Sequence, residues 1–386
     1  MKIFYWSPHI SHVATVTAVI NSIKSVKRYS SDKIQCKLID SIGEWSDQEQ
    51  ELKKSNIKTI KLYKNQKYSN LPRYGFIRSR LAYWIIFLNS FFPLKNCIKK
   101  FKPDFLIIHL ITSLPIVLNF FYNFETKIVL RVSGHPKLNF ARWFLWKILA
   151  KKIYKVVCPT EATRNFLIEK KIFDADKVFL LRDPIIEVSK INFLKKEKID
   201  QEYEEITDSK YLLTIGRLTK QKNYFFLLEC FVELIKLYPE YKLIIIGEGE
   251  DKKKLESQIS KKNLKDKVFI LPFTHNIFNF LEHSDCFIMS SLWEDPGFVL
   301  AEAVSVNKTV ISSDCPNGPS EILLNGDGGY LFSLNDKKSF LKKFQLFKEE
   351  MPEKVFLKKL RAKKNIKNYT LFRHFKDLKD VLIYEK

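Results

Sequence analysis

Short, continuously apolar runs alternate along the chain with segments of helical periodicity. In the first half, such runs lie at Lys2–Trp6, Asp104–Leu110, Lys127–Gly134, Tyr154–Thr160 and Lys177–Pro184. Residues 12–26, after the first run, have the apolar spacing of a helix. A strand without polar alternation is one that is covered on both faces, so the pattern predicts a parallel sheet with helices on both sides.

The same pattern restarts after the charged stretch 185–203, where we place a linker between two domains. The later runs are Tyr211–Leu218, Lys242–Gly249, Lys267–Phe273, Cys286–Ser291 and Thr309–Asp314. We therefore expect an α/β fold of two doubly wound, Rossmann-like parallel-sheet domains that face a cleft. The expected bounds are 1–190 for the N-terminal domain, 205–365 for the C-terminal domain and 366–386 for a closing helix, with packing back on the N-terminal domain as one option for that helix.

The charge is concentrated in the first half of the chain. The 386 residues carry 66 Lys and Arg against 43 Asp and Glu, for a net charge of +23. Residues 1–200 hold 36 basic and 16 acidic residues, whereas residues 201–386 hold 30 and 27. A lysine-rich proteome would explain many lysines but not this asymmetry, which favours an anionic partner for the first half: nucleic acid, a phospholipid surface or a phosphorylated ligand.

Cysteine usage and apolar length bear on the cellular location. The six cysteines form no C-x-x-C pair, which is typical of a reduced, cytosolic protein. The longest apolar run, Leu81–Leu94, is shorter than the roughly 20 residues that a membrane-spanning helix needs. Arginines and lysines flank it, so it predicts either a buried core helix or a helix lying on an anionic membrane surface. We expect a cytoplasmic protein, either free or peripheral on the inner face of the cytoplasmic membrane.

A glycine and two cations follow the first strand of the second half. In "TIGRLTKQKN", Gly216 lets the backbone turn closely, and Arg217 and Lys222 place two positive charges at the end of the strand. A forked guanidinium and a compact ammonium together suit a diphosphate, although a basic surface turn would read the same way. The nearby "IIIGEGED" lacks the third glycine of a dinucleotide fingerprint and predicts a plain strand-to-helix turn.

Two glutamates flank a predicted helix start in "SLWEDPGFVLAEA". Pro296 suits the first turn of a helix, so the amides of Gly297, Phe298 and Val299 are free to hold an anion such as a phosphate. Glu294 precedes the turn and Glu302 lies about one turn inside the helix. Carboxylates repel phosphate but accept hydrogen bonds from vicinal hydroxyls, so the arrangement describes a site for a nucleotide-sugar.

These motifs resemble those of retaining glycosyltransferases of the GT-B type, in the large bacterial group 1 family that makes capsule, O-antigen and lipid-linked glycans. The resemblance rests on "GRLTKQKN", "GEGED", "SLWEDPGFVLAEA" and "SDCPNGPSEIL" with "GGYLF", in family order and spacing. It extends more weakly to "ILRVSGHPKLN" and "CPTEATRNFL" in the first half.

The resemblance implies a role for each matched residue. Arg217 and Lys222 bind the donor diphosphate and stabilise the leaving nucleotide, while Gly216 allows its close approach. Glu294 contacts the hydroxyls of the donor sugar and Glu302 those of the ribose. The amides of Gly297, Phe298 and Val299 support the phosphates and the sugar.

The N-terminal half matches the family less well. Relatives often place a histidine near the reacting centre, for which His135 in "SGHP" is the candidate and His109 a weaker one; a loop histidine without a special role is the alternative. Many relatives carry a glycine-rich loop after the first strand. Here the loop Ser7–Val16 has no glycine and holds His9, Ser11 and His12 instead, which puts the phosphate contacts of that half in doubt.

The resemblance predicts an enzyme that moves a hexose or hexosamine from a nucleotide-diphosphate donor, with UDP favoured, to a hydroxyl of a lipid-linked or growing polysaccharide acceptor. It implies retention of configuration, no cofactor and no metal; the acidic pair in "DAD" (174–176) predicts a cap or turn. The alternatives are a catalytically silent nucleotide-sugar-binding subunit and a basic nucleic-acid-binding protein. No nucleic-acid module is recognisable, so we expect no nucleic-acid partner.

Overall fold

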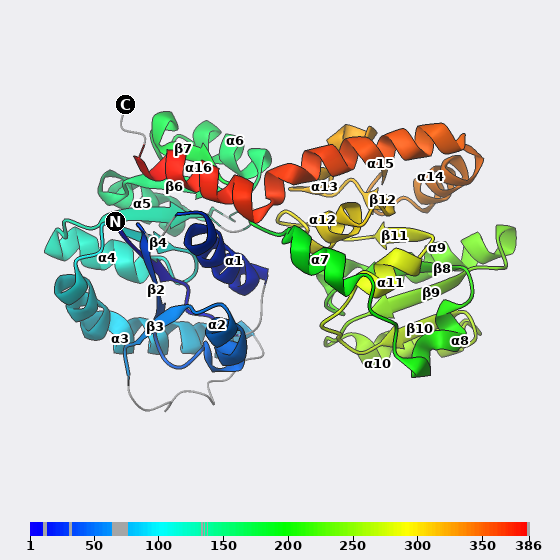
Figure 1. Cartoon of the computed structure of the whole chain (residues 1–386), viewed down its shortest axis with the longest axis horizontal. Helices are drawn as coiled ribbons and strands as arrows, with labels where there is room; N and C mark the ends of the chain where they lie inside the picture. Colours follow the sequence, from blue (N-terminus) through cyan, green and yellow to red (C-terminus); the bar gives the residue numbers. More distant parts are fainter. Residues whose placement is uncertain are drawn as a thin grey trace. The chain divides into compact units, whose positions relative to one another are not determined.

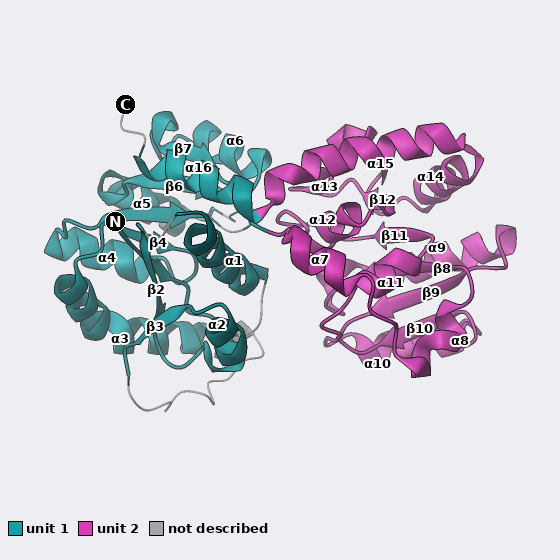
Figure 2. Ribbon diagram, in the orientation of Figure 1, with its two compact units in different colours: residues 1–184, 371–386 teal, residues 185–370 magenta. Residues whose placement is uncertain are grey.

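The computed structural model describes residues 1–10, 14–30, 33–63, 76–132, 134, 136 and 138–383, with the backbone alone for 76–79, 141 and 145. The chain forms two compact units (Figure 2). Unit 1 comprises residues 1–184 and 371–386, and unit 2 comprises residues 185–370. The chain therefore passes from unit 1 to unit 2 and returns to unit 1 for its last helix.

Unit 1 contains, within its described residues, one sheet of seven parallel strands in the order β3-β2-β1-β4-β5-β6-β7 (Figure 1). The strands are β1 (Lys2–Trp6), β2 (Gln35–Asp40), β3 (Lys58–Lys61), β4 (Phe105–Ile108), β5 (Lys127–Arg131), β6 (Lys155–Cys158) and β7 (Val178–Leu180). The order reverses between β1 and β4. Loops that leave the carboxyl ends of such a neighbouring pair run in opposite directions, which leaves space for a ligand there.

Helices cover both faces of this sheet. They are α1 (Ala14–Tyr29), α2 (Glu49–Lys54), α3 (Phe76–Phe101), α4 (Ser113–Tyr122), α5 (Phe140–Leu149), α6 (Glu161–Glu169) and α16 (Leu371–Ile383). Successive side chains of a strand point to opposite faces, so Ile3 and Tyr5 pack in one core with α1 and α16. Phe4 and Trp6 pack in the other core with α3, α4 and α5.

Unit 2 contains a sheet of six parallel strands among its residues, in the order β10-β9-β8-β11-β12-β13. The strands are β8 (Tyr211–Ile215), β9 (Lys242–Ile246), β10 (Val268–Leu271), β11 (Cys286–Met289), β12 (Thr309–Ser313) and β13 (Tyr330–Phe332). The helices are α7 (Val188–Leu194), α8 (Glu204–Thr207), α9 (Tyr224–Leu237), α10 (Lys252–Lys261), α11 (Phe278–His283), α12 (Phe298–Ser305), α13 (Pro319–Ile322), α14 (Lys337–Glu349) and α15 (Pro352–Ile366). Here the strand order reverses between β8 and β11.

The predicted fold class of two parallel-sheet, Rossmann-like domains is confirmed. Three strands, β2, β3 and β13, are additional to the predicted ones. The stretch 185–203, predicted to be a linker from its charge, lies inside unit 2. Its apolar residues Ile185, Ile186 and Ile191 are buried in the core of that unit, because the charged neighbours face outward while these three point inward.

Candidate functional site

The predicted site residues of unit 2 lie where the strand order reverses. Gly216 follows β8 directly, and residues 290–297 form the loop after β11. These two strands are neighbours, so their carboxyl ends bring the two loops together. This is the position at which open parallel sheets bind their ligands.

Gly216 makes a close approach that a side chain would obstruct. Its φ is 155°, and a Cβ there would lie 2.9 Å from the side-chain Cε of Lys222. A Cβ on Gly247, at the end of β9, would lie 2.0 Å from the carbonyl oxygen of Gly216. The absence of side chains therefore lets the two strand ends and the Lys222 side chain pack together.

Lys222 and Glu294 form an ion pair, with 2.6 Å between Nζ and Oε1. The Ser291 hydroxyl donates a hydrogen bond to the same carboxylate oxygen. The Glu294 side chain is 6% exposed and that of Lys222 is 16% exposed. A carboxylate this deeply buried stays charged at low cost only when a cation and hydrogen-bond donors accompany it, and Lys222 and Ser291 supply both.

Backbone and side-chain hydrogen bonds join the two loops. The Leu292 amide donates to the carbonyl of Gln221 at 2.8 Å, and the Gln221 side-chain amide donates to the carbonyl of Trp293 at 2.8 Å. The Ser290 hydroxyl donates to the carbonyl of Lys222 at 2.8 Å. The loops after β8 and β11 therefore form one rigid support that holds the ammonium against the carboxylate.

Helix α12 begins two residues later than the prediction. Gly297, with a φ of 101°, is its N-cap in the left-handed region, so the helix starts at Phe298 rather than at Pro296. A glycine reaches this φ without the strain that a side chain would impose, which explains the position of the turn. No side chain caps this end among the described residues. The amides of Gly297, Phe298, Val299 and Leu300 therefore have no partner within the helix.

The loop after β12 supports the start of α12. The Asn317 side-chain amide donates to the Asp295 carboxylate at 2.9 Å. A Cβ on Gly318 would lie 1.9 Å from the carbonyl oxygen of Pro296, so only glycine fits this contact. Sequence reasoning missed Ser291, Asp295 and Asn317 as parts of the site. Asp295 and Asn317, polar residues in loops that follow two strands, carried a signal that could have found them, whereas Ser291 did not.

Arg217 and Glu302 take no part in the ion pair. Arg217 is exposed, and its guanidinium makes no hydrogen bond or ion pair within the described part of the chain. Glu302 lies on α12, half-buried, and its carboxylate has no such partner among the described residues either. Burial raises the pKa of Glu302 to about 7, an effect that the nearby Lys190 partly offsets. The structure thus brings together Gly216, Lys222 and Glu294, and leaves Arg217 and Glu302 available for other contacts.

The histidine candidates belong to unit 1. His135, together with Ser11 and His12, lies outside the described residues. His109 follows β4 at the reversal point of the unit 1 sheet, where it is buried and neither ring nitrogen has a hydrogen-bond partner in the described structure. Burial is the main reason that the pKa of His109 is lowered well below its usual value, and the positive charge of Arg131 adds to the shift.

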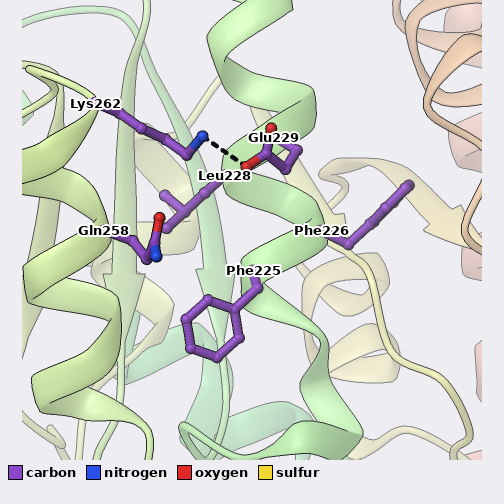
Figure 3. A pocket seen from close by; sticks show the side chains of 6 residues that line it. All are labelled: Phe225, Phe226, Leu228, Glu229, Gln258 and Lys262. Carbon is purple, nitrogen blue, oxygen red and sulfur yellow. Dashed lines mark ion pairs between the residues drawn. The ribbon is translucent and has the colours of Figure 1, made fainter.

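A surface pocket of unit 2 is separate from these residues. It has a volume of about 270 Å³ and lies between α9 and α10 (Figure 3). Its lining consists of Phe225, Phe226, Leu228, Glu229, Gln258 and Lys262. Glu229 and Lys262 pair across it at 2.6 Å. Within the described ranges, no three His, Cys, Asp or Glu side chains are grouped to hold a metal ion.

Comparison with known proteins identifies the family of unit 2. Residues 195–369 match the family described as "Glycosyl transferases group 1". An uncharacterised glycosyltransferase of Methanocaldococcus jannaschii is 35% identical over 251 residues, which are 61% of this chain and 62% of that protein. The chain thus spans about three fifths of the length of this relative.

The name of another relative states its substrates. It is the UDP-Gal:alpha-D-GlcNAc-diphosphoundecaprenol alpha-1,3-galactosyltransferase of Escherichia coli, which is 24% identical over 238 residues, 61% of each chain.

Solved structures extend the similarity in fold to the whole chain. A glycosyltransferase from Rickettsia africae has a TM-score of 0.76 at 17% identity, covering 99% of this chain and 97% of that one. The Anabaena protein HepE, in complex with UDP and glucose, has a TM-score of 0.71 at 15% identity and covers 99% of each chain. Unit 2 thus matches the glycosyl transferases group 1 family over residues 195–369, and the two parallel-sheet domains have the GT-B fold.

Proposed function

We propose that the chain is a retaining glycosyltransferase that moves a hexose or hexosamine from a UDP-linked donor to a hydroxyl of a lipid-linked or growing polysaccharide acceptor. The observation that carries this proposal is the Lys222–Glu294–Ser291 cluster at the point where the strand order of unit 2 reverses. The cluster places a cation and an acceptor of hydroxyl hydrogen bonds side by side, as a diphosphate joined to a sugar requires.

Lys222 can bind a phosphate without leaving Glu294. An ammonium has three donors, and the ion pair at 2.6 Å uses one of them. The remaining donors, the exposed Arg217 guanidinium and the first-turn amides of α12 would share the charge that develops on the departing diphosphate. These groups would do the work of a divalent metal, and metal independence is part of the proposal.

The two glutamates would hold the donor by its hydroxyls. One carboxylate oxygen of Glu294 binds Lys222 and Ser291. The other oxygen would accept a hydrogen bond from a hydroxyl of the donor sugar. Glu302, which lies on the same helix as the amides, would accept a hydrogen bond from a ribose hydroxyl. With a pKa of about 7 its carboxylate is the better acceptor above that pH, so donor binding should strengthen as the pH rises through 7.

Transfer with retention needs no carboxylate nucleophile. Following the family resemblance, the bond between the anomeric carbon and the diphosphate oxygen breaks, and the acceptor hydroxyl attacks from the same face of the sugar. Its proton passes to the departing phosphate oxygen. His135, near the reacting centre by the same resemblance, completes the proposed catalytic residues.

Relatives support the donor and the acceptor. The structures of HepE contain UDP, glucose or UDP-glucose. The names of the Escherichia coli relative and of a Campylobacter jejuni relative, 28% identical over 141 residues, specify diphospho-undecaprenol acceptors. A lipid-linked acceptor would place this chain, peripherally, on the inner face of the cytoplasmic membrane.

A donor panel tests the proposal. The full chain is screened with nucleotide-sugars by thermal shift, and donors that stabilise it enter an assay for nucleotide release with and without lipid-linked acceptors. We expect stabilisation by a UDP-sugar and acceptor-dependent release of UDP. Stabilisation without release under any acceptor would indicate a silent binding subunit, and the absence of stabilisation by every nucleotide-sugar would overturn the donor site.

A further inference from the structure

The outer surface of unit 1 exposes large apolar side chains along three helices. Those on α3, α4 and α5 with more than a third of their surface exposed are Leu81, Trp84, Leu88, Phe92, Phe120, Phe121, Phe140, Trp143, Phe144 and Ile148. We refer to these ten residues as the apolar face. Scattered single apolar residues on a surface are ordinary, whereas a contiguous set marks a surface that contacts something else.

Helix α3 carries two opposite apolar stripes. Ala82, Ile86 and Leu94 are buried, at intervals of four and eight residues. Leu88 and Phe92, four residues apart, are 66% and 61% exposed. The segment Arg80–Phe101 of this helix is, alone among the described residues, long and apolar enough to span a membrane by length and composition. Because its first stripe is part of the unit 1 core, α3 lies along the surface of a folded unit.

The helix is also longer than the sequence suggested. The apolar run Leu81–Leu94 was expected to be too short to span a bilayer, but α3 extends over the 26 residues Phe76–Phe101. The length of α3 would therefore permit it to span a bilayer, and it is the packing of α3 against the core of unit 1 that favours a helix lying on the surface of the unit.

The three helices that carry these residues lie next to one another. The Lys95 ammonium of α3 lies 4.5 Å from the centroid of the Tyr122 ring at the end of α4. On α5, the rings of Phe140 and Phe144 stack with centroids 6.0 Å apart. Helix α4 contacts both α3 and α5, so the three helices that carry the apolar face are neighbours.

The chain around this face is almost free of acidic residues. Residues 52–160 hold 21 Lys and Arg but only Asp104 and Glu125 as acids. Residues 52–160, which include α3, α4 and α5, therefore carry nearly all of the net positive charge of the first half. Apolar side chains set among lysines and arginines are the pattern of a helix that lies at the interface of an anionic bilayer.

A basic depression adjoins the end of α4. It has a volume of about 360 Å³, and its lining includes Lys127, Lys151, Lys152, Lys177, Glu125 and Tyr154. The Tyr154 hydroxyl is buried and has no hydrogen-bond partner among the described residues. The Lys127 ammonium lies 4.7 Å from the Tyr154 ring centroid. The lysine ammonium groups that line the depression suit one phosphate group.

We propose that the apolar face docks on an anionic phospholipid bilayer, with its side chains at the boundary of headgroups and acyl chains and a headgroup phosphate in the basic depression. A nucleic acid would pair with the cations, but it would not bury the exposed side chains of Leu88, Phe121 and Ile148. A second copy of the chain would cover the apolar residues but would bring two strongly basic surfaces together. The proposal concerns unit 1 alone and stands independently of the proposed transfer reaction.

Co-sedimentation of the full chain with vesicles tests the docking. We expect binding to phosphatidylcholine vesicles that contain phosphatidylglycerol, weaker binding at high salt, and little binding to pure phosphatidylcholine. Leu88→Ser with Phe92→Ser should weaken vesicle binding at least about tenfold, since each substitution removes an apolar side chain that would be buried among the acyl chains of the bilayer. Lys151→Glu with Lys152→Glu should weaken it by at least about fivefold per residue.

Two exposed apolar residues of unit 2 provide the matched control. Leu237 is 64% and Phe356 is 60% exposed, so Leu237→Ser with Phe356→Ser makes the same chemical change elsewhere. The control should bind vesicles as the wild type does. Equal losses in the control and in the α3 variant would overturn the proposed face.

A measurement on the unaltered chain keeps the test decisive if a variant fails to fold. Trp84 and Trp143 belong to the apolar face, so lipids brominated near the headgroup should quench the tryptophan fluorescence of the wild type in anionic vesicles. The proposal is wrong if there is neither sedimentation nor quenching. It is also wrong if the chain instead shifts RNA or DNA in a gel, or forms a dimer that the α3 variant abolishes, without binding vesicles.

Discussion

Both units place an ion pair near the carboxyl edge of a parallel sheet, yet the two pairs differ in their access to solvent. In unit 1, Arg131 at the end of β5 holds Asp183 through two hydrogen bonds, and the two side chains are 5% and 3% exposed. In unit 2, Lys222 is 16% exposed beside a buried Glu294. A pair sealed from water can only support structure, whereas a pair with one accessible member can also bind a ligand.

The comparison predicts its largest effect at Lys222. Lys222→Met leaves the Glu294 carboxylate buried without its cation and removes the proposed donor to the diphosphate. We expect turnover to fall about 10²- to 10³-fold, the range for loss of a preorganised charge. A release assay measures it, with Lys220→Met as the matched control, since Lys220 is exposed and only two residues away. A control that loses as much activity as Lys222→Met would contradict the assignment.

The sealed pair should instead affect stability. Asp183→Asn leaves the Arg131 guanidinium buried beside a neutral amide, so we expect a loss of about 3 kcal/mol in the free energy of unfolding of unit 1. Urea unfolding measures it, and kcat of the protein that remains folded should stay near that of the wild type. A large fall in kcat at unchanged stability would show that this pair, too, takes part in the reaction.

Removing the hydroxyl that supports Glu294 should have a moderate effect. Ser291→Ala deletes the hydrogen bond to Oε1 while keeping the ion pair with Lys222. We expect kcat to fall about tenfold, the equivalent of one hydrogen bond to a charged group, with the pair still formed. Ser291→Thr, which keeps a hydroxyl, should recover part of the activity, and equal losses for both substitutions would point to packing rather than to the hydrogen bond.

The units should respond to acid in opposite directions. In unit 1, the α16 residue His374 bonds to Ser22 at 2.8 Å and to the Arg182 carbonyl at 2.7 Å, and burial lowers its pKa to about 4. The unfolded chain binds a proton at higher pH than the folded one, so stability is full above about 6.5 and falls as the pH drops toward 4. Thermal unfolding between pH 7.5 and 4.5 should show this loss, and His374→Gln should reduce it.

In unit 2, the raised pKa of Glu302 acts with the other sign. The folded state keeps a proton on this carboxyl up to a pH of about 7, whereas the unfolded chain releases it near 4.5. The contribution of Glu302 to the stability of unit 2 is therefore most favourable below a pH of about 4.5 and is lost as the pH rises to about 7. Glu302→Gln should gain stability relative to the wild type between pH 5 and 8. An identical pH profile for both would show that Glu302 is not buried as described.

The sequence allowed the buried strands to be predicted because apolar runs such as Lys242–Ile246 have no other environment in a soluble domain. It did not reveal β2, whose residues Gln35–Asp40 mix polar and apolar types, or the edge strand β3, where lysines stand at both ends. For β3 the reason is physical: an edge strand is covered on fewer sides, so its sequence carries less of the apolar signal.

The site was predicted in its parts but not in its contacts. Lys222 and Glu294 were recognised from their motifs, yet their direct pairing joins residues 72 positions apart and depends on the β8–β11 neighbourhood. Ser291 carried no signal of its own, since serines are ordinary at strand ends. Long-range pairing of this kind follows from the strand order, which the local pattern does not contain.

Titration calorimetry of UDP against the full chain tests the central claim most directly, namely that the reversal point of unit 2 binds the donor diphosphate through Lys222. The wild type and Lys220→Met should bind UDP with equal affinity, and Lys222→Met should bind at least about tenfold more weakly. Equal UDP affinity in all three proteins, or no binding by the wild type, would contradict the account.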